Sequence, residues 1–302
     1  MMDRVAIIGA GLMGHGLALV FARGGHQVTI TDAFPQARAS VLNRVAATLT
    51  ALGQPADPVA LITVADDLPA CVAQADIIIE AAPEKLDLKQ RLFAELEAAA
   101  RPDAILASNT SVIPIGQIAA RITSKARVCG THWWNPPYLV PLVEVIETEG
   151  TAPETISRVM ALLTTLGKTP VHVRRDVPGF VGNRLQHALW REAIALVETG
   201  VCDAETIDLV VKSSFGRRLA VLGPLENADL IGTDLALDIQ TFLTPHLNNR
   251  AGPSPYLEAL NAEGRLGFKT GQGFRTWTPD QQAALRAKVL AHVTAINKLL
   301  ED

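Results

Sequence analysis

Gly9-Ala10-Gly11-Leu12-Met13-Gly14 lies between an apolar run, Val5–Ile8, and a segment with helical spacing of apolar residues, Leu12–Arg23. A G-x-G-x-x-G pattern is weak evidence alone, but a preceding strand and a following helix supply the context of a dinucleotide site. Gly9 makes the tight turn, Gly11 lets a pyrophosphate approach the backbone, and Gly14 lets helix and strand pack closely. The stretch therefore predicts a nucleotide-binding β-α unit, with free N–H groups at Leu12 and Met13 facing the phosphates.

A second strand pattern, Gln27–Thr31, ends at Asp32, 18 residues after Gly14. A carboxylate at this position accepts hydrogen bonds from the ribose hydroxyls of adenosine and repels a 2′-phosphate. Ala33 and Phe34 follow it, and neither could bind such a phosphate. The unit therefore predicts NAD rather than NADP as the cofactor. The alternative is a glycine-rich turn followed by an incidental aspartate.

Short strand-like runs alternate with helical patterns through the first part of the chain. After the first two strands come the runs 76–80, 104–107, 127–130, 142–146 and 170–174. Alternating strands and helices predict a Rossmann-type, doubly wound parallel sheet. Beyond it only helical patterns remain, at 180–198, 203–213, 227–243, 254–261 and 279–300. We expect an α/β NAD-binding domain, residues 1–177, followed by an all-α substrate and dimerisation domain, residues 178–302.

Composition excludes several classes of protein. The 302 residues are 48% hydrophobic and carry a formal charge of −4, which does not suit a nucleic-acid binder with a basic face. Three widely spaced cysteines, Cys71, Cys129 and Cys202, form neither a disulfide framework nor a metal motif. Glycines and a histidine interrupt the apolar run 4–21, which therefore does not resemble a signal peptide. We expect a cytoplasmic protein with no metal and no membrane partner.

Polar residues follow two of the predicted strands. Ser108-Asn109-Thr110-Ser111 comes directly after the run 104–107, and His132 after the run 127–130. Ligands of such sheets lie at the carboxyl ends of the strands, so these residues fall at the correct edge. Glu144 stands in an apolar strand and needs a partner, for which His132 is suited. The pair predicts a histidine base whose cation is stabilised as it forms. Taken singly, such a histidine more often packs in a core, and such a tetrad more often forms a turn.

Several motifs, in order, resemble those of the 3-hydroxyacyl-CoA dehydrogenase superfamily over nearly the whole chain. They are GAGLMG (9–14), Asp32, APEKLDLK (82–89), SNTS (108–111), HWWNPP (132–137), LVEV (142–145), PGFVGNRL (178–185), GPLE (223–226) and LGFKTGQGF (266–274). The resemblance implies that His132 is the general base, that Glu144 orients it, and that Ser111 and Asn183 bind the reacting oxygen. It also assigns four residues to the nicotinamide and ribose side of the cofactor: Glu84, Lys89, Asn109 and Asn135. Members of the family dimerise through the C-terminal domain, which implies a homodimer.

One segment departs from the enzymes that act on acyl-CoA. Those enzymes have a longer, lysine-rich helical tail after the second strand, whereas residues 33–75 contain no lysine and only Arg38 and Arg44. A highly charged nucleotide handle needs more cations. The run 135–144 is more similar to the free-acid branch, which includes gulonate 3-dehydrogenase with its lens-crystallin relative, carnitine dehydrogenase and a pyridine-carboxylate 5-dehydrogenase. The resemblance thus implies an NAD-dependent dehydrogenase that oxidises the secondary alcohol of a small 3-hydroxy acid. Candidates for binding the substrate carboxylate are Arg184, Arg217, Arg218 and Arg250.

Three alternatives stay open. The first is a 3-hydroxyacyl-CoA dehydrogenase that acts on CoA thioesters. The second is a β-hydroxyacid dehydrogenase related to phosphogluconate dehydrogenase, which is expected to carry a catalytic lysine on the long helix; residues 178–200 contain none. The third is a non-catalytic, crystallin-like structural protein, which would not require the four residues His132, Glu144, Ser111 and Asn183.

Overall fold

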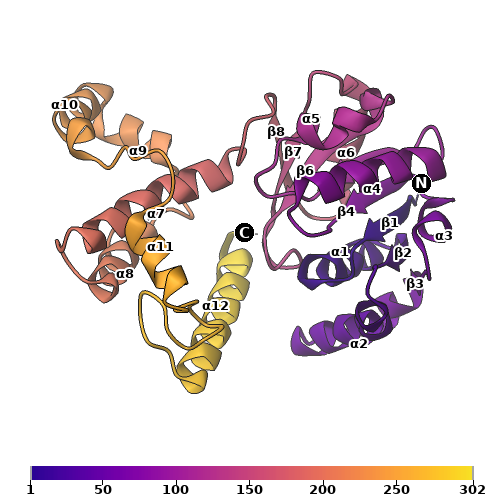
Figure 1. Ribbon diagram of the computed structural model, residues 1–302, viewed down its shortest axis with the longest axis horizontal. Coiled ribbons are helices and arrows are strands. Elements are labelled where there is room, and N and C mark those ends of the chain that lie inside the picture. Colours follow the sequence, from indigo (N-terminus) through magenta and orange to yellow (C-terminus); the bar gives the residue numbers. More distant parts are fainter. Residues whose placement is uncertain (1, 301–302) are drawn as a thin grey trace. The chain divides into compact units, whose positions relative to one another are not determined.

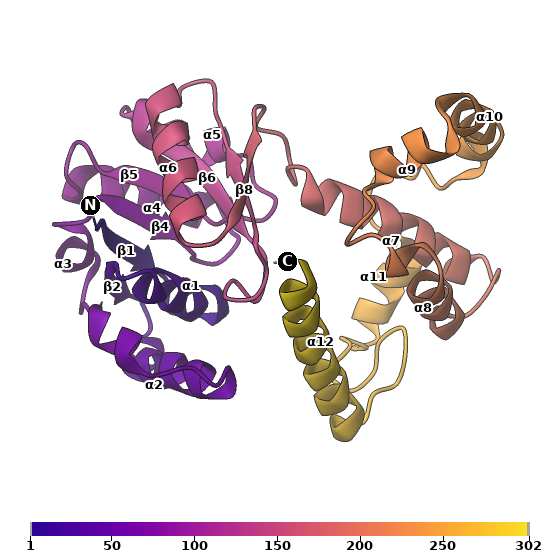
Figure 2. The ribbon, with the colours of Figure 1, turned by 180° about the vertical axis from the view of Figure 1, so that it is seen from behind.

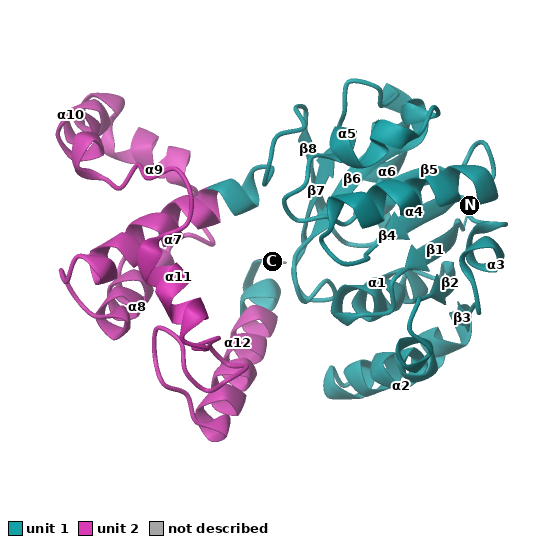
Figure 3. Cartoon of the chain, viewed as in Figure 1, with its two compact units in different colours: residues 1–184, 296–302 teal, residues 185–295 magenta. Residues whose placement is uncertain are grey.

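The computed structural model describes residues 2–300 of the chain. They form two compact units, residues 2–184 with 296–300 and residues 185–295 (Figure 3). The first of these units, unit 1, carries the sheet, and the second, unit 2, is helical (Figure 1).

Unit 1 is built on an eight-stranded sheet in the order β3-β2-β1-β4-β5-β6-β7-β8. The strands are β1 (Arg4–Ile8), β2 (Gln27–Thr31), β3 (Ile62–Val64), β4 (Ile77–Glu80), β5 (Ile105–Ser108), β6 (Val128–Trp133), β7 (Leu142–Ile146) and β8 (Thr169–Val173). Strand β1 lies between β2 and β4, and the chain moves outward from it in both directions (Figures 1 and 2). This is the Rossmann-type, doubly wound arrangement that the sequence predicts.

One pair of strands differs from the predicted all-parallel sheet. Strands β6 and β7 are antiparallel, whereas the other neighbouring pairs of the described sheet are parallel. A parallel neighbour needs a crossover of a dozen or more residues, usually with a helix. Only residues 134–141 connect β6 to β7, so β7 can return only in the opposite direction. The sheet is therefore mainly parallel, with a single reversal.

Helices cover both faces of the sheet. On one face α1 (Leu12–Arg23), α2 (Pro35–Ala51) and α6 (Pro153–Thr165) pack over the odd-numbered residues of β1, such as Val5 and Ile7. On the other, α3 (Leu68–Val72), α4 (Leu86–Ala99) and α5 (Ile115–Ile118) pack over Ala6 and Ile8. Since alternate residues of a strand point to opposite faces, a strand buried on both sides must be apolar throughout. Burial on both sides explains the continuous apolar runs in the sequence.

One strand, β3, and two helices, α2 and α3, lie in residues 33–75, for which the sequence predicts no element. Strand β3 has only three residues, too few for a periodic pattern to be recognised. Helix α2 begins at Pro35, a residue suited to the first helical turn.

Unit 2 contains α8 (Ala204–Ser213), α9 (Pro224–Ile231), α10 (Thr233–Leu243), α11 (Pro255–Ala262) and most of α7 (Gly182–Glu198) and α12 (Pro279–Leu300). The prediction of one helix over 227–243 is wrong, because the chain forms α9 and α10 there. Gly232 separates them with a φ of 94°, a left-handed conformation that ends a right-handed helix. None of the described helices has the length and apolar content needed to cross a bilayer.

The compact units separate after Arg184, inside the first turns of α7. The sequence analysis places the functional boundary earlier, between residues 177 and 178, and that division stays a prediction. Contacts explain why residues 178–184 cluster with the sheet. Phe180 is fully buried in the same core as Ile115 and Val173, and Asn183 donates a hydrogen bond to the backbone of Ser111.

Candidate active site

His132 and Glu144 lie directly opposite each other on β6 and β7. The antiparallel reversal of β7 creates this register, so both side chains project from the same face of the sheet. His132 Nδ1 and Glu144 Oε2 are 2.7 Å apart, and both side chains are at least 95% buried. A buried carboxylate and an imidazole at this distance form the pair that the sequence predicts.

The second oxygen of Glu144 is also engaged. Its Oε1 accepts hydrogen bonds from the N–H groups of Val181, at 2.9 Å, and Gly182, at 3.0 Å. Gly182 is the first residue of α7, whose free N–H groups and positive dipole favour a negative charge at this end. Glu144 thus joins the base to the beginning of α7.

These contacts set the charge of Glu144. Burial is the largest influence and raises the pKa of this carboxyl, but hydrogen bonds from His132, Gly182 and Val181 outweigh it and hold the pKa below its ordinary value. Glu144 is therefore ionised at neutral pH and accepts the proton on Nδ1 of His132. The basic nitrogen of the imidazole is then Nε2.

Two aromatic rings enclose His132. The ring centroid of Trp134 lies 5.2 Å from that of the imidazole, and the ring centroid of Phe180 lies 5.7 Å from it. Gly182 makes room for Trp134, because a Cβ at this position would lie 2.5 Å from Cζ2 of the indole. The imidazole is thereby fixed by packing as well as by Glu144.

Asn183 and Ser111 are brought together, although they are 72 residues apart. Asn183 Nδ2 donates to the backbone oxygen of Ser111 at 2.8 Å, and the asparagine side chain is buried. Ser111 itself is exposed, next to the end of β5. The sequence predicted that both residues serve one site; the role of each at a reacting oxygen stays a prediction.

Glu84 organises the segment that contains Ser111. Its Oε1 accepts hydrogen bonds from the Thr110 hydroxyl, from Ser111 N at 3.0 Å and from Val112 N at 3.1 Å. Burial is again the largest influence and raises the pKa of Glu84, but these bonds and the charge of Lys89 hold it below its ordinary value. Glu84 is thus an ionised cap for residues 110–112.

Lys89 lies inside the protein, with its ammonium among three oxygens. Nζ is 2.7 Å from Glu80 Oε1, 3.1 Å from Ala82 O and 3.5 Å from Glu84 Oε2. Ser108 Oγ donates to the other oxygen of Glu80 at 2.6 Å. The cofactor role assigned to Lys89 stays a prediction, and the structure shows that this side chain also joins Glu80 to Glu84.

Glu80 and Ser108 support the site, although the sequence assigned neither of them to this role. A signal was present, because Glu80 ends an apolar strand, β4, whose residues are all buried. A carboxylate in that setting requires a cation or several donors, and here Lys89 and Ser108 supply them.

Asn109 and Asn135 have different surroundings. Asn109 Oδ1 accepts a hydrogen bond from Trp133 N at 3.0 Å, which ties the end of β5 to the end of β6. Asn135 is exposed in the segment that follows β6. Both lie at the carboxyl edge of the sheet, and their cofactor contacts stay predictions.

The glycine-rich loop has the geometry that its sequence predicts. Gly9 has a φ of 107°, and a Cβ on Gly14 would lie 1.7 Å from Gly9 O. A Cβ on Gly11 would meet no atom within 4 Å, so the chain leaves space beside the start of α1 at Leu12 and Met13. That space and the free N–H groups of a helix N-terminus fit a pyrophosphate.

Asp32 holds the same loop from the end of β2. Its Oδ2 accepts a hydrogen bond from Ala10 N at 2.7 Å, and its Oδ1 accepts one from Phe34 N at 2.8 Å. Two arginines of α2 also reach this region: Arg38 donates to Asp32 O, and Arg44 to the carbonyls of Ala10 and Gly11. These backbone contacts of Arg38 and Arg44 could not be predicted from the sequence, which shows only that residues 33–75 contain two arginines.

The four arginines proposed to bind a carboxylate are divided between the units. Arg184 is in unit 1, whereas Arg217, Arg218 and Arg250 are in unit 2. Arg250 forms an ion pair with Glu198, with Nη1 and Oε2 at 2.9 Å. Their role in substrate binding stays a prediction.

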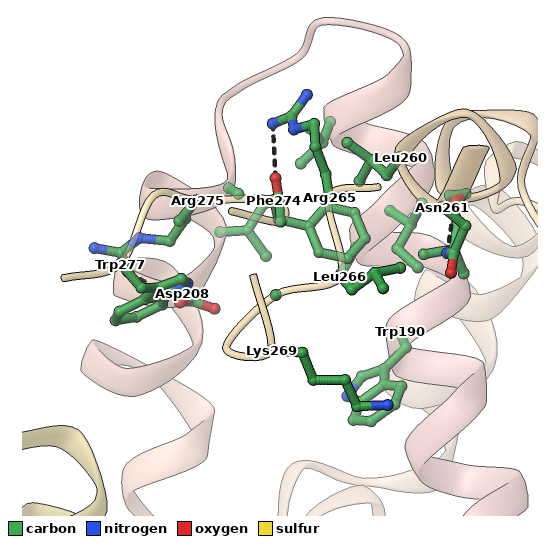
Figure 4. A pocket seen from close by; sticks show the side chains of 18 residues that line it. Trp190, Asp208, Leu260, Asn261, Arg265, Leu266, Lys269, Phe274, Arg275 and Trp277 are labelled. Carbon is green, nitrogen blue, oxygen red and sulfur yellow. Dashed lines mark hydrogen bonds and ion pairs between the residues drawn. The ribbon is translucent and has the colours of Figure 1, made fainter. Parts of the chain in front are cut away.

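Unit 2 contains a cavity of about 570 Å³. Its lining is mainly apolar and comes from α7, α8, α11 and the segment 265–277, with Trp190, Phe274 and Trp277 around it (Figure 4). No residue that the sequence assigns to catalysis or cofactor binding lines this cavity.

Comparisons with known proteins agree with this architecture. The family model described as "3-hydroxyacyl-CoA dehydrogenase, NAD binding domain" matches residues 4–177, and that of the corresponding C-terminal domain matches residues 179–277. A crystal structure of 5-formyl-3-hydroxy-2-methylpyridine 4-carboxylic acid 5-dehydrogenase, described as an NAD⁺-dependent dismutase, superimposes with a TM-score of 0.91. It is 38% identical in sequence, over 100% of this chain and 99% of the other.

Curated relatives include both free-acid and CoA enzymes. The 5-formyl-3-hydroxy-2-methylpyridine 4-carboxylate 5-dehydrogenase of Mesorhizobium japonicum is 40% identical, over 100% of this chain and 99% of its own length. The L-carnitine dehydrogenase of Streptomyces coelicolor is 38% identical, over 83% of this chain and 78% of its own. The 3-hydroxyadipyl-CoA dehydrogenase of Escherichia coli is 36% identical, over 93% of this chain but only 60% of its own.

The glycine loop yields a prediction with a built-in control. Gly11→Ala should leave the melting temperature unchanged, because the added methyl meets no protein atom, but should weaken NADH binding at least about tenfold, since it fills the space left for a phosphate. Gly14→Ala should lower the melting temperature by several degrees, because its methyl overlaps Gly9 O. Thermal unfolding and NADH fluorescence titration measure both effects. If Gly11→Ala binds NADH normally, the phosphate site lies elsewhere.

Proposed function

This chain belongs to the 3-hydroxyacyl-CoA dehydrogenase family, and we propose that within the family it oxidises the secondary alcohol of a small free hydroxy acid, with His132 as the base. It is an oxidoreductase that uses NAD. The observation that carries the proposed chemistry is the buried His132–Glu144 pair, in which both carboxylate oxygens are occupied.

The base acts through Nε2 of His132. With Nδ1–H directed at Glu144, Nε2 is free to take the proton of a substrate hydroxyl as the carbon–hydrogen bond breaks. The imidazolium that results is stabilised by the adjacent carboxylate, while the two N–H groups of Val181 and Gly182 keep that carboxylate ionised. We assign Ser111 and Asn183 to the substrate oxygen, because the Asn183–Ser111 hydrogen bond holds them together.

The remaining assigned residues fit the cofactor. We assign the pyrophosphate to Gly9, Gly11, Gly14 and the N–H groups of Leu12 and Met13, and the adenosine ribose to Asp32. We assign the nicotinamide side to Glu84, Lys89, Asn109 and Asn135. Glu84, Asn109 and Asn135 follow the ends of β4, β5 and β6, and Lys89 lies in α4. When bound there, NAD accepts the hydride at its nicotinamide ring. We place the boundary between the cofactor and substrate domains at residues 177 and 178, where the two family models also divide.

Two features favour a free acid over a CoA thioester. Residues 33–75 contain no lysine, and their two arginines donate hydrogen bonds to backbone carbonyls of unit 1. The pyridine-carboxylate and carnitine relatives also act on acids that carry no CoA. The 3-hydroxyadipyl-CoA relative, which is 36% identical, supports the thioester as the second candidate.

A substrate panel tests this choice. We expect kcat/KM for at least one free acid with a secondary alcohol, among 3-hydroxybutyrate, L-carnitine and L-gulonate, to exceed that for 3-hydroxybutyryl-CoA at least about tenfold, or about 1.4 kcal/mol. NADH absorbance gives the rates. If the thioester is used better than every free acid, the second candidate is correct.

Removal of the base tests the mechanism. His132→Ala should lower kcat by about 10²–10⁴-fold with little change in NADH affinity, because a positioned general base contributes a factor of this size. Glu144→Gln should also slow turnover, since an amide does not stabilise the imidazolium, although its oxygen can still accept from Val181 and Gly182.

The chain offers a matched control for this experiment. His172 and Glu147 form a second histidine–glutamate pair at 2.7 Å, partly exposed. His172→Ala should leave kcat unchanged. A His132→Ala enzyme that keeps more than about a tenth of the rate would assign the base to another residue.

We also infer a homodimer formed through unit 2 in the cytoplasm. Helices α8, α9 and α10 contain no buried residue. Large apolar side chains are therefore exposed on them, and Leu225, Leu230, Leu237 and Phe242 are each at least 66% exposed. Apolar surface of this kind is typical of protein interfaces. The free thiols of Cys71, Cys129 and Cys202 suit a reducing compartment.

Light scattering tests the dimer. The mass in solution should be twice 32.2 kDa, and Phe242→Asp should shift it towards the monomer, because a charge in an apolar interface is costly. Lys298→Asp, a charge change outside α8–α10, serves as the control. A monomeric unmodified protein would contradict the inference.

A further inference from the structure

The segment 134–141 joins the two strands that carry the catalytic pair. It begins directly after Trp133, contains Asn135, and ends before Leu142 of β7. The N–H groups of Leu139 and Val140 both donate to Pro136 O at 3.0 Å, so the segment turns on itself. Small shifts of this segment would move both Asn135 and the strand that carries Glu144.

Lys168 reaches this segment from the turn between α6 and β8. Its ammonium donates to the backbone oxygen of Pro137 and, at 3.1 Å, to that of Val140. It also lies 5.6 Å from the ring centroid of Trp133, within the range of a cation–π interaction. A single cation thus bridges two carbonyls of segment 134–141 and an aromatic residue next to His132.

The surroundings of Lys168 are unfavourable for a charge. Burial, with a smaller contribution from the positive Arg23, lowers the pKa of Lys168 to about 8. Among the described residues, Lys168 forms no ion pair, and its two hydrogen bonds go to uncharged carbonyls. A partly buried cation costs free energy unless such bonds compensate for lost hydration. The burial of this ammonium therefore indicates that its contacts with segment 134–141 have a structural or functional role.

The segment also packs on α1. A Cβ on Gly16 would lie 2.6 Å from Cγ of Pro137 and 3.4 Å from Cδ1 of Tyr138. Helix α1 begins at the glycine-rich loop, so segment 134–141 contacts both Lys168 and the helix of the dinucleotide site.

We propose that Lys168 is a positioning residue, which fixes segment 134–141 against α1 and so maintains the geometry of Asn135 and the His132–Glu144 pair during hydride transfer. The proposal rests on the proposed dehydrogenase function. Lys168 need not touch substrate or cofactor: it acts through the two carbonyls. Because a displacement of about 1 Å can cost roughly 10²-fold in rate, loss of this anchor should appear mainly in kcat.

Arg127 provides a matched control at the other end of β6. Its Nη1 donates to the backbone oxygens of Arg101, at 2.6 Å, and Ala104, at 3.1 Å, and burial lowers its pKa as it does for Lys168. Lys168→Met and Arg127→Met therefore each remove a partly buried cation that caps two carbonyls. Only the first removes it from the catalytic edge of the sheet.

We expect Lys168→Met to lower kcat at least about tenfold, with the NADH dissociation constant changed less than about threefold. Hydrogen exchange at Tyr138, Leu139 and Val140 should become faster. Lys168→Arg, which keeps a cation and its donors, should restore part of kcat. Arg127→Met should lose thermal stability without a comparable fall in kcat. If both Met variants lower kcat equally, or if exchange in segment 134–141 is unchanged, the positioning role is wrong.

A second variant reaches the same segment without altering Lys168. Gly16→Ala forces Pro137 away from α1, so this variant should also lower kcat and accelerate hydrogen exchange in segment 134–141. It therefore tests the proposal even if Lys168→Met fails to fold. An unchanged kcat and unchanged exchange would contradict the proposal. If the unmodified protein oxidises no compound in the panel, the proposed function fails. Hydrogen exchange then still decides whether Lys168 anchors the segment.

Discussion

The carboxylate of Glu144 is the group on which the site depends. One oxygen binds the imidazole of His132, and the other accepts two N–H groups at the beginning of α7. Leaving a buried charged group without its hydrogen-bond partner costs about 1–3 kcal/mol or more, a sizeable part of the about 5–15 kcal/mol that stabilises a domain. A single carboxylate therefore links β6, β7 and α7, and it couples the chemistry of the base to the stability of the fold around it.

Other acidic side chains at the carboxyl edge of the sheet also connect separate parts of the chain through hydrogen bonds. Glu80 is neutralised by Lys89 and Ser108, Glu84 caps the segment that contains Ser111, and Asp32 holds Ala10 of the glycine-rich loop. Each carboxylate accepts hydrogen bonds from backbone or side-chain donors, and these include donors that are distant in sequence. Because hydrogen bonds to charged groups contribute more than neutral ones, these contacts are well suited to hold the loops at this edge of the sheet.

Sequence reasoning recovered the sheet well where the pattern had a physical cause, as in β1, β4 and β5, which are buried on both faces and therefore apolar throughout. The prediction was wrong where a strand direction depended on chain topology, and where a helix ended because of the backbone conformation of a single residue. Nothing in the β7 pattern shows its direction; the short connection after β6 sets it. Periodicity also ran through Gly232, although its left-handed conformation divides α9 from α10. For the site, motifs identified the catalytic candidates, but not the supports Glu80, Ser108 and Lys168, whose partners are backbone groups or side chains remote in sequence.

The sequence by itself determined the dinucleotide unit and the pairing of His132 with Glu144. Glycine spacing, strand periodicity and the need of a buried acid for a partner are local constraints that any fold must satisfy. Only the tertiary structure decided what surrounds that pair. The antiparallel register sets the two side chains opposite each other, and the N–H groups of α7 and the ammonium of Lys168 come from residues far along the chain. Contacts of this kind depend on how the chain packs, because hydrogen-bonding groups of the backbone are the same in every residue except proline and carry no sequence signal.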